Sequence, residues 1–118
     1  MFDKITELNL RYDFYSPLLT EKQREVVRLY RCENFSLSEI GEEFSISRQG
    51  VYDALKNAER ALAEYEEKLG LVRKLEYTSG LGRDAERRID AIISENPKNG
   101  NLTDELRGLK AIVGELSQ

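Results

Sequence analysis

An all-α fold follows from two features of the sequence. Apolar residues recur at spacings of three and four along nearly every segment, and the alternation typical of strands is absent. The helix-breaking residue proline stands only at positions 17 and 97. The 118 residues suit one compact domain or a small domain with a helical extension. We expect a helix-turn-helix domain over residues 1–70 and a C-terminal helical extension over residues 71–118, with one continuous domain as the alternative.

The N-terminal part is predicted to hold two helices. The first covers Phe2 to about Tyr15, and Pro17 ends it because the residue before a proline avoids helical angles. Thr20 is predicted as the N-cap of the second helix. Gln23 stands three residues later, where it completes a capping box.

Residues 36–62 have the pattern of a helix-turn-helix. Ser36 is predicted to cap the first helix and Ser47 the second, with a short turn between them. Two helices that cross steeply over a short turn need a small residue where they approach, and Gly41 supplies it. The small core beneath is expected to consist of Ile40, Phe44, Ile46, Val51 and Leu55.

The helix that begins after Ser47 is predicted to be long, because no clear stop precedes Gly70, and a run on toward Tyr77 is the alternative. Its apolar residues alternate at spacings of four and three, which is typical of a seam against another helix. The seam comprises Val51, Leu55, Ala58, Leu62, Tyr65, Leu69 and Val72. It serves either packing within the chain or a partner in a dimer, and the periodicity leaves both open.

Two further helices are predicted in the C-terminal part. The stretch TSGLGRD, residues 78–84, contains two glycines and is predicted to be a turn. Asp84 would then cap the helix that follows. Residues 96–101, NPKNGN, are predicted to form a loop, and Thr103 to cap the last helix.

The first turn after Ser47 is the candidate nucleic-acid interface. Arg48, Gln49 and Tyr52 are expected to face outward and to approach base edges, because Arg and Gln suit bidentate contact with guanine and adenine. A second set of residues is expected to contact the phosphates, together with the unpaired backbone amides at the helix N-terminus. This set comprises Ser47, Lys56, Arg24 and Arg28.

Two copies are expected to be needed for useful affinity, because one helix of this kind buries little surface. The seam and the tyrosine-rich first helix are the candidate surfaces of a homodimer. Core packing within one chain is the alternative for both.

The charge balance counts against strong nonspecific binding. The chain has a net charge of −4, and residues 19–62 hold seven basic and eight acidic residues, a net of −1. Nonspecific binding depends on the neutralisation of phosphates, and dedicated binders carry a basic face. Asp53 on the outer face would also repel phosphate. The alternative is therefore a helical adaptor that does not bind DNA, whose acidic surface would meet basic surfaces of a partner.

The residue content argues against an enzyme. There is no histidine and a single cysteine, so a histidine base, a zinc site and a Cys–His nucleophile are all missing. Glu42 with Glu43, or Glu64 with Glu66 and Glu67, would be the acidic groups for magnesium. Neighbouring side chains splay around a helix, so a solvated charged face is favoured. We expect no catalytic residue, metal or cofactor.

The sequence predicts a cytoplasmic protein. One cysteine cannot form an internal disulfide, which fits a reducing compartment. The N-terminus lacks the pattern of a signal peptide, and no apolar run approaches the length of a membrane span.

Four stretches make the chain resemble the YlxM family of helix-turn-helix proteins from Gram-positive bacteria and mollicutes. They are FYSPLLTEKQ, FSLSEIGEEF, SRQGVYD and YEEKLGL, within residues 14–71. The resemblance implies a fold like region 4 of sigma factors and no enzymatic activity. It also implies a regulatory link to the signal recognition particle pathway, through DNA, RNA or the particle's own components. Gly41 and Gly50 depart from the family, which commonly has alanine at both positions.

Overall fold

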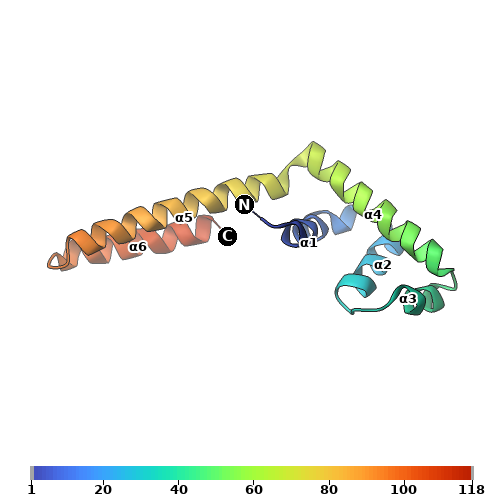
Figure 1. Ribbon diagram of the computed structural model, residues 1–118. Coiled ribbons are helices and arrows are strands. Elements are labelled where there is room, and N and C mark those ends of the chain that lie inside the picture. Colours follow the sequence, from blue (N-terminus) through green and yellow to red (C-terminus); the bar gives the residue numbers. More distant parts are fainter. Residues whose placement is uncertain (1, 118) are drawn as a thin grey trace. The chain divides into compact units, whose positions relative to one another are not determined.

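A computed structural model describes residues 2–117 of the chain. Within this range the chain forms six α-helices and one short 3-10 helix, and no strand (Figure 1). The predicted all-α class is confirmed. In chain order the elements are α1 (Lys4–Tyr15), η1 (Ser16–Leu18), α2 (Glu21–Arg31), α3 (Leu37–Phe44), α4 (Arg48–Leu69), α5 (Leu71–Glu95) and α6 (Gly100–Leu116).

The helices belong to two compact units. Residues 2–72 form the first unit, and the chain from residue 73 onward forms the second. The first unit therefore contains the helix-turn-helix and the second unit the α5–α6 hairpin. Over residues 2–117, no helix has both the length and the apolar content that crossing a bilayer requires.

Side-chain caps begin the helices of the first unit. Thr20 and Gln23 form the predicted capping box of α2, and Ser36 forms one with Glu39 at α3. Ser47 Oγ accepts a hydrogen bond from the Gly50 amide at 3.0 Å and caps α4. These three predicted caps are confirmed.

The first helix begins later than predicted, at Lys4 rather than Phe2. The Asp3 carboxylate accepts a hydrogen bond from the Thr6 amide at 2.7 Å and so makes Asp3 the N-cap. This hydrogen bond lowers the pKa of Asp3, because it stabilises the ionised carboxylate.

The core of the first unit lies where α4 packs against α1, α2 and α3. The larger cluster joins three helices, and Tyr12 links it to a smaller cluster of Tyr15, Leu19 and Leu62. The seam of α4 from Val51 to Tyr65 therefore packs within the chain, whereas Leu69 is 55% exposed. Tyr12 and Tyr15 of the first helix pack in the core too. The larger cluster comprises Val26, Val27, Leu29, Ile40, Val51, Leu55 and Ala58.

The predicted turn at residues 78–84 is wrong, because the whole stretch lies inside α5. Glycine without proline is tolerated within a helix at a cost of about 1 kcal/mol. At Gly82 the α5 backbone comes so close to Ser117 beyond α6 that a Cβ would overlap it. Asp84 caps no helix. It pairs instead with Arg87 at 3.4 Å and Arg88 at 3.2 Å, one turn further along α5.

Two helix boundaries in the C-terminal part also differ from prediction. The long helix does end before Gly70, whose left-handed backbone (φ 64°) forms the C-cap of α4. However, α5 begins directly at Leu71. Asn99, not Thr103, caps α6, since its side chain accepts from the Leu102 amide at 3.1 Å. The loop is thereby shortened to residues 96–99.

Candidate nucleic-acid interface

The turn between α3 and α4 is set by a close backbone contact. Ser45 ends α3 in a left-handed conformation (φ 56°, ψ 42°), and the Ile46 amide donates to the Gly41 carbonyl at 2.9 Å. A Cβ at Gly41 would lie 2.7 Å from the Ile46 carbonyl oxygen. Only glycine fits this approach without displacing the backbone, so Gly41 fixes where α4 begins relative to α3.

The first turn of α4 presents open amides. Ser47 satisfies the Gly50 amide through its Oγ and the Val51 amide through its carbonyl. Within the described residues, the amides of Arg48 and Gln49 donate to no protein group. A helix N-terminus of this kind suits an anion, because the amides and the helix dipole point toward it.

The structure brings the three predicted base-reading residues together. Arg48, Gln49 and Tyr52 are exposed, Tyr52 to 46%, and with Leu37 of α3 they line one shallow hollow. The Gln49 Nε2 donates to Asp53 Oδ1 at 3.0 Å. This hydrogen bond orients the Gln49 side-chain amide. It also keeps the Asp53 carboxylate beside the hollow.

Lys56 lies one turn further along α4 and is partly engaged. Its Nζ stands 5.5 Å from the centre of the Tyr52 ring, a cation–π contact, and 3.7 Å from Glu59 Oε2. Glu59 is shared with Arg31 of α2 at 3.6 Å. Since both contacts are exposed, they are weak, and Lys56 can still turn toward a phosphate.

Charge is unevenly distributed along α4. Residues 48–60 hold three basic and two acidic residues, a net of +1, whereas residues 61–69 hold one basic and three acidic residues, a net of −2. The end of α4 at the helix-turn-helix is therefore its positive end. The opposite end would repel nucleic acid, which favours contact through the first turns only.

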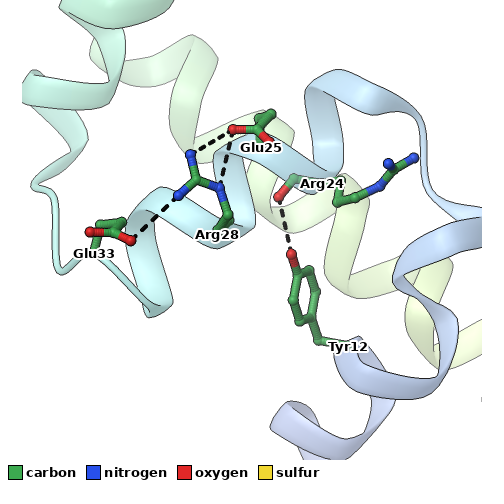
Figure 2. A network of polar contacts seen from close by, with 5 residues as sticks. All are labelled: Tyr12, Arg24, Glu25, Arg28 and Glu33. Atoms are coloured by element: carbon green, nitrogen blue, oxygen red, sulfur yellow. Dashed lines mark hydrogen bonds and ion pairs between the residues drawn. The ribbon is translucent and has the colours of Figure 1, made fainter.

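Arg24 is not part of this surface. Its Nε donates to the Ser16 carbonyl at 3.2 Å and its Nη2 to the Leu19 carbonyl at 3.3 Å, so the half-buried guanidinium holds the end of η1. The backbone carbonyl of Arg24 accepts from the Tyr12 hydroxyl at 3.4 Å (Figure 2). These contacts occupy the side chain with the fold, and its predicted role toward phosphate stays a prediction.

Arg28 is engaged by two carboxylates. Figure 2 shows its guanidinium between Glu25, at 2.8 Å from Nη2, and Glu33, at 3.4 Å from Nη1. The hydrogen bond to Glu25 raises the pKa of Arg28 and lowers that of Glu25, because each charge stabilises the other. A phosphate at Arg28 would have to compete with both carboxylates, and this predicted role also stays a prediction.

Glu66 is a residue whose environment the sequence did not reveal. The periodicity placed it on a solvated charged face with Glu64 and Glu67, but its side chain is buried, with 7% exposed. Its Oε1 accepts from the Tyr15 hydroxyl at 2.7 Å and from the Val72 amide at 3.0 Å. The predicted solvated position is therefore wrong for Glu66.

Over residues 2–117, no three His, Cys, Asp or Glu side chains gather closely enough to hold a metal ion.

Comparison with known proteins bears on this geometry. Residues 2–99 match the UPF0122 family, described as "Putative helix-turn-helix protein, YlxM / p13 like". The chain belongs to the UPF0122 family. The resemblance seen in the four stretches is thereby confirmed, and the match extends beyond them to include all of α5.

Relatives in this family span much of the chain. A UPF0122 protein of Listeria innocua is 41% identical over 112 residues, which cover 95% of this chain and 99% of the relative. One of Halalkalibacterium halodurans is 49% identical over 90 residues, or 76% and 83% of the two chains. One of Caldanaerobacter subterraneus subsp. tengcongensis is 58% identical over 74 residues, 63% of each chain.

Proposed function

We propose that this UPF0122 protein is a regulator that reads nucleic-acid sequence with the first turn of α4. One observation carries the proposal: Arg48, Gln49 and Tyr52 are exposed together at the positive end of a helix that the Gly41 contact fixes in place. Arg and Gln offer the bidentate hydrogen bonds that distinguish guanine and adenine in a major groove. The family description as a helix-turn-helix protein supports the same use.

The wider setting that we propose is cytoplasmic regulation linked to the signal recognition particle pathway, and it rests on the family resemblance. Because the exposed end of α4 is small, we propose that two copies act together on one site. A homodimer would place two such ends on successive half-sites of a duplex.

Selection of duplexes from a random-sequence pool tests the reading surface. The wild-type protein is expected to enrich one motif, and Arg48→Ala or Gln49→Ala to weaken preference at single positions by roughly 5- to 100-fold. Arg60→Ala is the matched control for base reading, because Arg60 is an exposed arginine on the same helix, two turns beyond the reading residues. It is expected to leave the sequence preference unchanged and to weaken binding equally for all sequences, as the loss of a phosphate contact does. Equal enrichment by the wild type and the Arg48→Ala/Gln49→Ala double variant would contradict the proposal.

Salt dependence gives a second prediction. Only Arg48, Lys56 and Arg60 are available as cations on the first half of α4, so each protomer is expected to release about three counterions. A plot of log affinity against log salt for the enriched duplex should then have a slope of about −3 per protomer, or less steep. A slope twice as steep would require cations elsewhere, such as Arg24 and Arg28.

The second candidate function is an adaptor that contacts the RNA or protein of the signal recognition particle. It is favoured by the net charge of −4 and by the internal engagement of Arg24 and Arg28. Pull-down of the particle at physiological salt separates the two functions. An adaptor would keep the particle when Arg48 and Gln49 are both replaced by alanine, and would enrich no duplex.

A further inference from the structure

The α5–α6 hairpin carries exposed apolar side chains in large number for its size. Figure 1 shows the two helices antiparallel. Ser79 Oγ donates to the Ser117 carbonyl at 3.1 Å, and Lys110 Nζ donates to both Asp90 carboxylate oxygens at 2.9 and 3.2 Å. Five aliphatic side chains are each between 40% and 73% exposed. We call them the apolar face; they are Leu81, Ile92, Leu109, Ile112 and Leu116.

These five residues lie on one side of the hairpin. At 100° per residue, Leu81 and Ile92 point within about 20° of each other on α5, and the three residues of α6 fall within an arc of about 60°. Leu81 and Leu116 also line a single apolar hollow between the helices, together with Ala85. The exposed apolar residues of the two helices therefore share one side of the hairpin, interrupted on α5 by the Asp84–Arg88 pair.

The hairpin has little core of its own. Among residues 73–117, Ile89 is the sole large apolar side chain that is buried, and α6 buries none. The first unit, by contrast, buries eleven apolar side chains. A helical hairpin of this size does not offset its conformational entropy with one buried side chain, so its apolar face requires a cover.

We propose that the apolar face binds the same face of a second copy, so that two hairpins form a four-helix bundle. The five residues expose on the order of 450 Å². A specific protein–protein interface of standard size covers ~800 Å² per partner, and homodimer interfaces are ~65% apolar, so the available apolar surface is close to the low end of what a stable dimer needs. The inference deepens the proposed function by naming the surface that would join two reading helices.

Charge on the same side of the hairpin agrees with a second copy as the occupant. Arg88, whose side chain is 79% exposed, points the same way as Leu81 and Ile92 and lies between them on α5, where it pairs with Asp84. On α6, Glu105 lines a hollow with Leu109 and Ile112. A two-fold arrangement that sets α5 of one copy against α6 of the other would bring opposite charges together on both sides. The other predicted dimer surfaces, the α4 seam from Val51 to Tyr65 and the tyrosines of α1, are occupied in the core.

Sedimentation velocity of the full chain without nucleic acid tests the dimer. The wild type is expected to sediment as a dimer at micromolar concentration, and Leu109→Glu/Ile112→Glu to raise the dissociation constant at least 100-fold. Ala111→Glu is the matched control, because Ala111 is exposed on the opposite side of α6. A wild-type monomer, or a double variant that still dimerises, would overturn the proposal.

Cross-linking keeps the test valid if the double variant loses helicity. In a Cys32→Ser background, a mixture of the Ile92→Cys and Leu109→Cys proteins should form a mixed disulfide dimer on mild oxidation, because α5 of one copy faces α6 of the other at this height. A mixture of the Ile92→Cys and Ala111→Cys proteins should not. Equal cross-linking of the two mixtures would overturn the proposal, as would protection of Leu109→Cys in a monomer, which would mean that the same chain covers the face. The duplex selection tests the proposed function separately. A protein that enriches no duplex can still dimerise, and a monomer can still enrich a duplex, so the failure of one proposal is distinguishable from the failure of the other.

Discussion

Replacing Glu66 by alanine is expected to lower the free energy of unfolding of the first unit by about 2–4 kcal/mol. The buried Glu66 Oε1 accepts from both the Tyr15 hydroxyl and the Val72 amide, and the Tyr15 hydroxyl accepts in turn from the Leu71 amide at 3.1 Å. Removing the carboxylate would leave a buried hydroxyl and a buried amide without their acceptor, and would open a cavity beside them. Urea unfolding followed by circular dichroism measures the loss.

Two variants separate this effect from a general loss of charge. Glu66→Gln keeps a carbonyl oxygen at similar length and is expected to recover about half of the loss, because it can still accept from Tyr15. Glu67→Ala alters an exposed neighbour on the same turn and should change stability by less than ~0.5 kcal/mol. Equal effects of Glu66→Ala and Glu67→Ala would contradict the role of Glu66.

The same hydrogen bonds make stability depend on alkaline pH. Burial, and then the hydrogen bond to Glu66, raise the pKa of Tyr15 above the ordinary value of 10.0. The folded state thus favours neutral Tyr15. Its contribution is complete below pH 10 and is lost as the pH rises through the raised pKa. The difference in stability between the wild type and Tyr15→Phe, about 1–2 kcal/mol at pH 7, should therefore narrow above pH 10. A constant difference up to pH 11 would contradict this.

Gly41→Val is the second substitution with a large expected effect, a loss of about 2–3 kcal/mol. Its Cβ would lie 2.7 Å from the Ile46 carbonyl oxygen, and backbone in a tight turn cannot yield as a flexible side chain does. Since this contact fixes α4 against α3, the variant should also lose the duplex enrichment of the wild type. Urea unfolding and the duplex selection measure the two effects.

Gly50→Ala provides the contrast at the other glycine of the helix-turn-helix. There a Cβ would meet Ser47 Oγ at 3.3 Å and Ile46 Cβ at 3.7 Å, which small shifts can accommodate. Alanine is favoured over glycine within a helix by up to ~1 kcal/mol, so we expect a gain of about 0.5 kcal/mol. If Gly41→Val and Gly50→Ala cost the same, the close contact at Gly41 would not be what sets the turn.

Local interactions could be predicted from the amino-acid sequence. Thr20, Ser36 and Ser47 each cap a helix through an amide three residues away, so residue type and spacing determine the contact. The same applies to the exposure of Arg48 and Gln49, because the periodicity of Val51 and Leu55 shows which side of the helix faces the core.

Features that depend on distant parts of the chain became visible in the folded protein alone. Glu66 is buried because Tyr15, 51 residues earlier, supplies a donor, and Arg24 is engaged because the carbonyls of η1 lie beside it. Gly82 lies inside a helix and against Ser117, although its local pattern favours a turn. Hydrogen bonds within one helical turn depend on residues that are close in sequence. Burial and ion pairing depend on which helices pack together. A periodic apolar pattern predicts that a helix packs against another helix, but it does not say which one.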